Sequence, residues 1–464
     1  MSSFSDLGVP TRLADVLSSR SITTPTPIQA VTLPDSLSGR DVLGRGRTGS
    51  GKTLAFLLPV VTRLSAGPRA RSRAPRALIL APTRELVGQI DAVLAPLAKA
   101  AGLSSRTVFG GVGQNPQVTA LQRGVDIVVA CPGRLEDLIR QGHCTLDAVE
   151  VTVLDEADHM ADLGFLPAVR RLLGMTPKKG QRLLFSATLD RAVDTLVRQY
   201  LANPVVHEAD SATSPIVEMS HHVLQVERDL RLPVLLRLTN TPGRTVVFTR
   251  TKHGSKALAR QLSRSGVPAV ELHGNLSQNA RIRNLAEFHA GRVTTLVATD
   301  IAARGIHVDD VTLVIHADPP ADHKAYLHRS GRTARAGNAG TVVTMMTQEQ
   351  TREVRDLTRA AGIKATTTQV PSAEHPILET LTSGERLPLV PQQVTAPATQ
   401  GRRESDRRGA PAAQRPARRR RGSGRAHTGG ANTGAPRSGQ PASGRTAPGR
   451  RSASAKDGEA RRRS

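Results

Sequence analysis

Short apolar runs that alternate with amphipathic stretches are the feature that most limits how this chain can fold. Segments with helical periodicity separate the runs, for example residues 53–64. Fully apolar strands separated by helices are typical of parallel sheets that are covered by helices on both faces. The apolar runs are residues 76–81, 125–130, 151–154, 182–186, 245–249, 293–299, 311–316 and 341–346.

A polar stretch at residues 203–215 interrupts this alternation, which then begins again. A chain of 464 residues is also long for a single core. The sequence therefore predicts two α/β domains in series, joined by a linker, and the repeated alternation suggests that the two share one architecture.

The C-terminal part has a different composition. From Glu385 onward it contains 19 Lys and Arg residues against 5 Asp and Glu, and it is rich in Gly, Pro, Ser and Arg without apolar periodicity. Such a segment buries too little apolar surface to offset its ordering entropy, which predicts disorder over 385–464. Because it has no aromatic residue, it would bind phosphate by charge alone. Two roles stay open, a solubilising extension and an RNA tether.

The whole chain has a formal net charge of +25, which indicates a polyanionic partner, with nucleic acid first. Two cysteines are too few for a disulfide framework or a four-cysteine zinc site. The N-terminus has no signal-peptide pattern, and no run of about 18 apolar residues occurs. We therefore expect a soluble cytoplasmic protein without membrane partners.

The segment GRTGSGKT fits the phosphate-loop pattern at Gly46, Gly51, Lys52 and Thr53. It follows a short apolar run and opens the 53–64 helix, so backbone N–H groups and the helix N-terminus can meet phosphate oxygens. Lys52 would reach the β- and γ-phosphates, and the Thr53 hydroxyl would bind Mg²⁺. The ATP-binding residues expected in this loop are Gly46, Arg47, Thr48, Gly49, Ser50, Gly51, Lys52 and Thr53.

Three carboxylates follow the apolar run 151–154, at Asp155, Glu156 and Asp158. Taken alone they could form a solvated turn. Beside a phosphate loop, Asp155 is placed to hold Mg²⁺ at a second strand end, and Glu156 to orient the attacking water.

Together these motifs and several shorter ones resemble a DEAD-box RNA helicase of superfamily two, from Phe4 to about Thr368. AspGluAlaAsp stands unaltered at 155–158. The shorter motifs are ThrProThrProIleGln at 24–29, ProThrArgGluLeu at 82–86, GlyGly at 110–111, ProGlyArg at 132–134, SerAlaThr at 186–188, PheThrArgThr at 248–251, GlnAsnAlaArg at 278–281, AlaThrAspIleAlaAlaArgGly at 298–305 and HisArgSerGlyArgThrAlaArg at 328–335. Their order and spacing, more than any one of them, carry the resemblance.

The resemblance implies two tandem RecA-like domains with ATP and Mg²⁺ in the cleft between them. Gln29 would read the adenine edge, with Phe4 and Ile22 near it, and Gly305 and His307 would contribute to ATP binding. The implied segments are an adenine-recognition segment at 1–32, an ATP-binding domain at 33–208, a linker at 209–218, a second helicase domain at 219–370 and the basic tail at 385–464.

The resemblance also implies how hydrolysis is coupled to RNA. Lys52, Asp155 and Glu156 would be catalytic, and Arg332 and Arg335 would act as arginine fingers. The residues that would couple the two sites are Asp158, Ser186, Thr188 and His328. The residues that would hold the RNA backbone are Arg84, Gly110, Gly111, Gly133, Arg134, Arg250, Gln278, Arg281 and Thr299. Backbone contacts carry little sequence preference, and contacts to 2′-hydroxyls favour RNA over DNA.

Four positions depart from the family's usual pattern. Ile22 stands where an aromatic residue usually lies next to adenine. Gly46 replaces a common alanine. Cys131 replaces a threonine before ProGlyArg, which removes an RNA-facing hydroxyl. His307 stands where an aspartate usually contacts the ribose, and a histidine there can still form a hydrogen bond.

We therefore expect an RNA-dependent ATPase that separates short RNA duplexes or remodels RNA–protein complexes. A DNA helicase or translocase, and an RNA clamp with little hydrolysis, are the alternatives. Backbone readout does not identify the physiological RNA, so ribosomal and messenger RNA–protein complexes both stay open as substrates.

Overall fold

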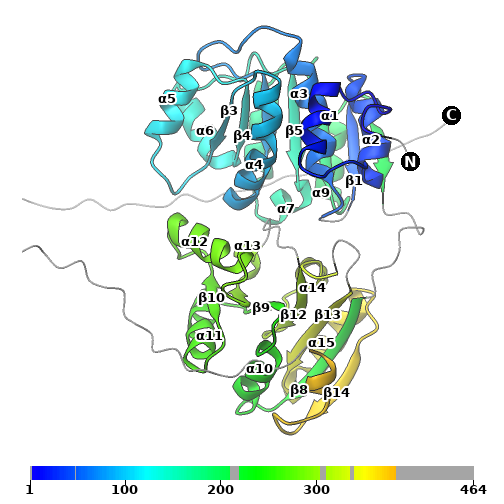
Figure 1. Ribbon diagram of the computed structural model, residues 1–464, viewed down its shortest axis with the longest axis vertical. Helices are drawn as coiled ribbons and strands as arrows, with labels where there is room; N and C mark the ends of the chain where they lie inside the picture. Colours follow the sequence, from blue (N-terminus) through cyan, green and yellow to red (C-terminus); the bar gives the residue numbers. More distant parts are fainter. Residues whose placement is uncertain (1–2, 47–48, 210–218, 304–309, 335–338, 383–464) are drawn as a thin grey trace, which may run out of the picture. The chain divides into compact units, whose positions relative to one another are not determined.

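The computed structural model describes residues 3–46, 49–209, 219–303, 310–334 and 339–382. We refer to residues 3–209 as the first lobe and to residues 219–382 as the second lobe. Figure 1 shows that each lobe is built on its own sheet with helices beside it. None of the helices within these ranges is both long and apolar enough to cross a membrane.

The first lobe contains a parallel sheet in the order β3-β4-β2-β5-β6-β1-β7. Within it β5, β6 and β1 are neighbours, and Val153 of β5 lies opposite Leu183 of β6. The strands are β1 Val42–Arg45, β2 Ala77–Leu80, β3 Ser105–Val108, β4 Ile127–Ala130, β5 Val151–Asp155, β6 Gln181–Ser186 and β7 Val205–Glu208.

Helices cover both faces of this sheet because its central strands are apolar on both sides. On β2, Ala77 and Ile79 pack in one hydrophobic core with helices α1 to α4. Leu78 and Leu80 point the other way, into a second core with α5 to α9. The helices are α1 Thr11–Ser18, α2 Pro27–Leu37, α3 Lys52–Ser65, α4 Arg84–Ala100, α5 Asn115–Arg123, α6 Pro132–Arg140, α7 Ala157–Asp162, α8 Leu166–Met175 and α9 Arg191–Tyr200.

The second lobe repeats this topology. Its sheet has the order β10-β11-β9-β12-β13-β8-β14, which is the first order with each strand advanced by seven. The strands are β8 Met219–Val226, β9 Arg244–Phe248, β10 Ala269–Leu272, β11 Thr295–Ala298, β12 Val311–His316, β13 Gly340–Met346 and β14 Thr366–Val370. The helices are α10 Arg231–Thr239, α11 Lys252–Arg264, α12 Gln278–His289, α13 Asp300–Ala303, α14 His323–Ser330, η1 Gln348–Gln350, α15 Thr351–Ala360 and α16 Ile377–Thr380.

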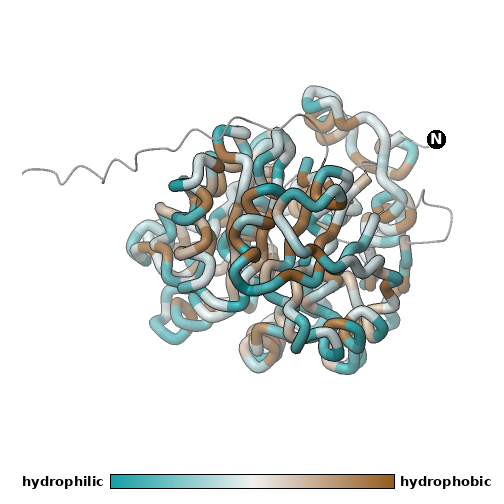
Figure 2. Tube along the Cα trace, turned by 90° about the horizontal axis from the view of Figure 1, so that it is seen from below, coloured by the Kyte–Doolittle hydropathy of each residue, from teal (hydrophilic) through white to brown (hydrophobic). Residues whose placement is uncertain are grey.

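The predicted fold class, two tandem parallel-sheet domains, is confirmed. Each of the eight apolar runs forms a strand, and Figure 2 shows hydrophobic segments along the trace between hydrophilic turns. The strands that the sequence did not reveal include the sheet edges β3, β7, β10 and β14. These edges are partly exposed and carry polar side chains, so their apolar pattern is weak. β7 lies inside the polar stretch 203–215, which therefore belongs partly to the first sheet.

Two of the expected segment boundaries, at residues 32–33 and at residue 370, fall within parts of the chain that the structure describes. The boundary between residues 32 and 33 falls within α2, which is one continuous helix. Leu378 and Leu381 pack in a core of the second lobe, so that core continues beyond residue 370. The predictions for residues 210–218 of the linker and for the tail at 385–464 lie outside the described residues.

His316 is a fully buried histidine at the end of β12. One ring nitrogen, Nδ1, lies 3.0 Å from the Thr344 hydroxyl, and the ring packs against the edge of Tyr326 at 4.9 Å between centroids. Burial, and then the positive charge of Arg329, lowers the pKa of His316 well below the ordinary histidine value. Just below the ordinary histidine pKa, the ring therefore stays neutral in the folded second lobe, whereas in an unfolded chain it binds a proton.

The second lobe should consequently lose stability as the pH falls below the unfolded histidine pKa of about 6.5. Replacing His316→Asn keeps a hydrogen-bonding group near Thr344 but removes the titration. In a Tyr200→Phe background, Tyr326 is the single tyrosine of a chain without tryptophan, so tyrosine fluorescence follows this lobe in urea. We expect the urea midpoint to fall between about pH 7 and about pH 5, and to fall less with His316→Asn. An equal fall in both proteins would contradict the assignment.

Candidate nucleotide and RNA site

The phosphate loop joins β1 to α3. Gly51, immediately before the helix, has a left-handed backbone with φ of 97°. A Cβ there would lie 2.5 Å from the Thr26 hydroxyl, so both the backbone and the close packing favour glycine. The Lys52 ammonium is nearly buried and donates to the Gly46 carbonyl at 2.6 Å. The predicted residues Arg47 and Thr48 lie outside the described residues.

The strand order brings three motifs to one edge of the first sheet. β5, β6 and β1 are adjacent and parallel, so the loops that follow them leave the sheet side by side. The amide of Gly46, after β1, donates to the carbonyl of Ser186, at the end of β6, at 3.2 Å. Asp155 ends β5. Motifs about 100 residues apart in the sequence thus meet at the carboxyl edge, where open α/β sheets bind ligands.

Asp155 is 3% exposed, and its environment opposes its negative charge. Burial, followed by the charge of Glu156, raises the pKa of Asp155 to about 7, although Lys52 acts in the opposite direction. A buried carboxylate of this kind is stabilised as an anion by a cation at its oxygens. The side chain is therefore suited to hold a divalent metal.

Glu156 is held in a different way. Its backbone is left-handed, with φ of 52°, and it precedes the short helix α7. Burial alone raises the pKa of this carboxyl, but a hydrogen bond from His159 and the charges of His159, Arg332 and Lys52 together lower it to about 2. Neighbouring carboxyls with opposite pKa shifts are typical of sites where one group binds a cation and the other accepts a proton or hydrogen bond.

Asp158 links α7 to the loop after β6. One carboxylate oxygen, Oδ2, accepts hydrogen bonds from both the amide and the hydroxyl of Thr188, each at 2.8 Å. The Ser186 hydroxyl accepts from the Asp158 amide at 3.3 Å and donates to the Thr188 carbonyl at 2.7 Å. Three of the four residues predicted to couple the nucleotide and RNA sites thus form one network, in which a shift of α7 would move the loop.

A cavity of about 200 Å³ lies beside the phosphate loop. Ile22, Gln29, Gly51 and Thr53 line it together with apolar residues of α1 and α4, which suits the flat base of a nucleotide. Gln29 uses both ends of its amide inside the chain, accepting from the Thr26 amide and donating to the Gly51 carbonyl, each at 2.9 Å. Phe4 is buried in the adjoining core and is not among the lining residues.

The RNA-contact residues predicted in the first lobe come from separate loops that lie close together. Gly111, with φ of 79°, lies so near the Arg84 guanidinium that any Cβ would collide with it. Arg134, in the first turn of α6 after Gly133, donates to the Val112 carbonyl at 3.4 Å. Gly110 and Gly111 lie beside Arg134 and Arg84, and without side chains the glycines leave room for a phosphate to approach the backbone.

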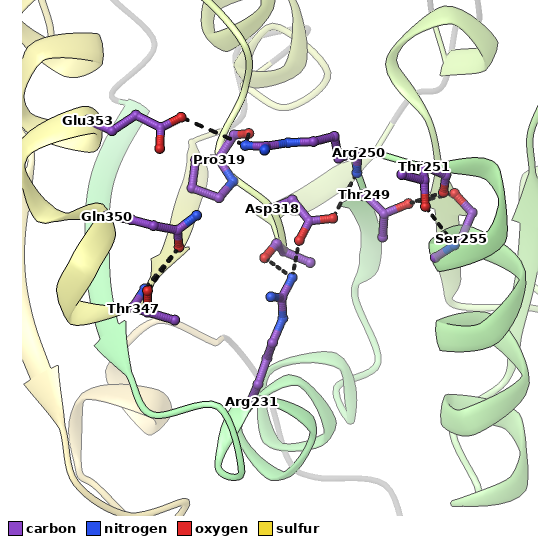
Figure 3. A network of polar contacts seen from close by, with 12 residues as sticks. Arg231, Thr249, Arg250, Thr251, Ser255, Asp318, Pro319, Thr347, Gln350 and Glu353 are labelled. Atoms are coloured by element: carbon purple, nitrogen blue, oxygen red, sulfur yellow. Dashed lines mark hydrogen bonds and ion pairs between the residues drawn. The ribbon is translucent and has the colours of Figure 1, made fainter.

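Figure 3 shows the surroundings of Arg250, an RNA-contact residue predicted in the second lobe. Asp318, just after β12, accepts from the Arg250 amide at 2.8 Å and also pairs with Arg231. The Arg250 guanidinium donates to the Pro319 carbonyl at 3.4 Å and lies 3.7 Å from Glu353. The turn that carries Arg250 is therefore held by a half-buried aspartate, while its guanidinium stays exposed.

The other RNA-contact residues predicted in the second lobe follow β10 and β11. The Thr299 amide donates to the Leu272 carbonyl at 3.2 Å. Arg281, on α12, donates to Glu85 at 2.7 Å, and Gln278 accepts from Arg84 at 3.3 Å. Arg281 and Gln278 thus contact Glu85 and Arg84, while Thr299 is held by the backbone at the end of β10.

Two further predicted residues, His328 and Arg332, lie on or just after α14. Arg332 is 5% exposed and donates to the carbonyl of His328 at 3.3 Å. Its positive charge contributes to the low pKa of Glu156. Gly305, His307 and Arg335, which were expected to contact ATP or the γ-phosphate, lie outside the described residues.

His159 is a residue of the site that sequence reasoning missed. Its Nδ1 lies 2.9 Å from Glu156 Oε2, within the first turn of α7. The signal in the sequence was its position three residues after Glu156, a spacing that places two side chains on one helix face.

Fold and site together define a class of protein. Two RecA-like lobes of one topology, with a phosphate loop on the first and an arginine motif on the second, are the architecture of a helicase-type nucleoside triphosphatase.

Comparison with known proteins gives the family. The family model described as DEAD/DEAH box helicase matches residues 26–196, and the Helicase conserved C-terminal domain matches residues 228–337. The chain is 43% identical over 316 residues to the ATP-dependent RNA helicase RhlB of Pseudomonas putida, covering 66% of this chain and 79% of that protein. It is 40% identical over 364 residues to the DEAD-box ATP-dependent RNA helicase 30 of Arabidopsis thaliana, covering 77% of this chain and 62% of that one.

The fold also matches solved structures. S. cerevisiae Dbp5 bound to RNA and ADP BeF3 aligns with a TM-score of 0.72 at 27% identity, over 82% of this chain and 100% of that one. Mss116p bound to ssRNA and AMP-PNP aligns with a TM-score of 0.70 at 26% identity, over 82% and 83%. The chain belongs to the DEAD-box family of ATP-dependent RNA helicases.

Cys131 allows a test of how α6 is held. It is the N-cap residue of α6, with an extended backbone, and its side chain makes no capping hydrogen bond. Cys131→Thr supplies a capping hydroxyl, which typically stabilises a helix by about 1 kcal/mol. Amide hydrogen exchange in the first turns of α6 should then slow by about fivefold, provided that exchange follows local opening. Cys131→Val, which has the same shape without the hydroxyl, is the control, and equal exchange in both variants would refute the capping effect.

Proposed function

We propose that this chain is an RNA-dependent ATPase that separates short RNA duplexes or remodels RNA–protein complexes. The support that carries the proposal is the meeting of three loops at one sheet edge, where the Ser186–Thr188 loop is hydrogen-bonded both to the phosphate loop and to Asp158. The residues proposed to act on the nucleotide are thereby linked to the Ser186–Thr188 loop within the first lobe.

In the proposed mechanism, Lys52 and the backbone of the phosphate loop hold the phosphates. Glu156 accepts a hydrogen bond from the attacking water, and Arg332 and Arg335 stabilise the charge that develops on the transferred phosphate. Because Asp158 bonds to Thr188, a change at the nucleotide is passed to the loop after β6. Ser186 takes part in the same network, and His328 adjoins Arg332.

We assign Mg²⁺ to Asp155 and Thr53. The raised pKa of the buried Asp155 carboxyl and its position beside the phosphate loop suit a cation there. When bound, the ion supplies charge neutralisation for the β- and γ-phosphates.

The adenine is assigned to the cavity lined by Ile22, Gln29 and Gly51. Because Gln29 also donates to the phosphate loop at Gly51, adenine binding and loop geometry are coupled. Phe4 supports this region from the core, and Gly305 and His307 complete the predicted set on the second lobe.

The RNA backbone is assigned to the glycines and arginines of the first lobe and to Arg250, Gln278, Arg281 and Thr299 of the second. The arginines and backbone N–H groups of this set favour phosphate, so we expect little preference for sequence. Ribosomal and messenger RNA–protein complexes are the candidate substrates, and a cytoplasmic location stays a prediction.

The first experiment is steady-state ATP hydrolysis by the full chain with no nucleic acid, with single-stranded RNA and with DNA of the same sequence. We expect RNA alone to stimulate hydrolysis strongly. We also expect Glu156→Gln to reduce the stimulated rate by about 10²–10⁴-fold, the range typical of a lost general base, while nucleotide still binds.

Other outcomes support the alternatives. Equal stimulation by DNA would favour a DNA translocase, because it would remove the role of the 2′-hydroxyl. RNA binding without hydrolysis by the unmodified chain would favour an RNA clamp.

The basic tail is tested separately. Its net charge of +14 from Glu385 onward predicts a salt-sensitive tether that raises the local RNA concentration. Ending the chain before Glu385 should raise the RNA concentration for half-maximal ATPase at low salt, and leave the maximal rate nearly unchanged. A matched control replaces Arg418, Arg419, Arg420 and Arg421 by glutamine at full length, which should give a smaller change in the same direction. Identical half-saturation with and without the tail would exclude tethering.

A further inference from the structure

The environment of Glu156 contains a second polar side chain to which the proposed mechanism assigns no role. His159 is 4% exposed and lies one helical turn after Glu156 on α7. Its Nδ1 is 2.9 Å from Glu156 Oε2, and the Glu156 side chain itself is 13% exposed. The contact is therefore shielded from water, which strengthens a hydrogen bond to a charged acceptor.

The direction of this hydrogen bond follows from the charge of Glu156. A glutamate carboxyl is ordinarily ionised near neutral pH, and an ionised carboxylate can only accept hydrogen bonds. The imidazole proton therefore lies on Nδ1, and His159 donates. One oxygen of Glu156 is thereby occupied, and the other stays available to a water molecule.

The other ring nitrogen of His159 indicates that packing alone does not explain this residue. Nε2 is buried and has no hydrogen-bond partner among the described residues. Burying a polar atom without a partner is destabilising, and an apolar side chain of similar size would avoid that cost. Within the described ranges, the polar contact of the ring is the one to Glu156.

The backbone adds a reason for such a contact. Glu156 has a left-handed backbone conformation, which disfavours side chains other than glycine, asparagine and aspartate. The position of its carboxylate relative to the phosphate loop thus depends on contacts made by the side chain.

We propose that His159 is a positioning residue, whose imidazole holds the Glu156 carboxylate where it can orient the attacking water. This inference rests on the proposed ATPase function. It predicts a loss in turnover without a loss in nucleotide binding. The His159 side chain contacts the carboxylate proposed to act on water, and within the described part of the chain it forms no hydrogen bond with the phosphate loop.

The test compares two replacements of His159 in the full chain, with saturating RNA. His159→Asn places an amide N–H near the position of Nδ1, whereas His159→Leu fills similar space and donates no hydrogen bond. We expect kcat for ATP to fall by about tenfold or more with leucine, the range of a lost hydrogen bond to a charged group, and to stay within about threefold of the unmodified value with asparagine. The KM for ATP should stay within about twofold in both.

Two controls separate positioning from folding. In a Glu156→Gln background, His159→Leu should cause no further loss, because the carboxylate it positions is absent. His159→Met is a second non-donor of flexible shape, which tests the inference if the leucine variant does not fold. A circular dichroism melt of each variant establishes folding before rates are compared.

The outcomes are distinct. An unmodified chain that hydrolyses ATP while the leucine and methionine variants keep full kcat would overturn the role of His159 alone. Asparagine as damaging as leucine, or equal losses with and without Glu156, would also overturn it and indicate a structural role. An unmodified chain that hydrolyses no ATP with RNA would overturn both the proposed function and this inference.

Discussion

The burial of negative charge at the end of β5 is the constraint on which the rest of the site depends. Asp155, Glu156 and Asp158 follow one apolar strand within four residues, and the chain deals with each charge differently. The negative charge of Asp155 is only partly compensated by its surroundings, as the raised pKa of this carboxyl indicates. The charge of Glu156 is stabilised by a hydrogen bond from His159 and by the positive charges of Arg332 and Lys52. Asp158 is satisfied by Thr188. In the proposed mechanism, one turn of chain thus provides a cation ligand, a group that orients water and a link to the loop after β6.

The sheet order makes this arrangement possible. Because β6 lies between β5 and β1, the Ser186–Thr188 loop contacts both the carboxylates and the phosphate loop. In the proposed mechanism, this position lets the loop respond to changes at the carboxylates and at the phosphate loop. The coupling therefore depends on strand adjacency, which no single motif specifies.

The amino-acid sequence was sufficient to predict the fold class, and it revealed the motifs from which the candidate site is built, for identifiable reasons. Strands such as β2 and β5 are apolar on both faces, so their composition alone revealed them. Edge strands such as β7 are polar and were visible only after the sheet was known. His159 was missed because a lone histidine on a short helix is usually a packing residue. Its significance comes from the left-handed backbone of Glu156, which sequence patterns do not reveal.

The shared strand order of the two lobes has a consequence for how many nucleotides one chain binds. β8 occupies the place in the second sheet that β1 occupies in the first. After β8 the chain continues as Glu227, Arg228, Asp229 and Leu230 into α10, with no glycine and no lysine at the turn. The second lobe retains the scaffold of a nucleotide-binding domain without a loop that could wrap phosphates. In the two sheets that the structure describes, the repeated fold therefore carries a phosphate loop on the first lobe and none after β8, and the stoichiometry expected from this asymmetry is one ATP per chain.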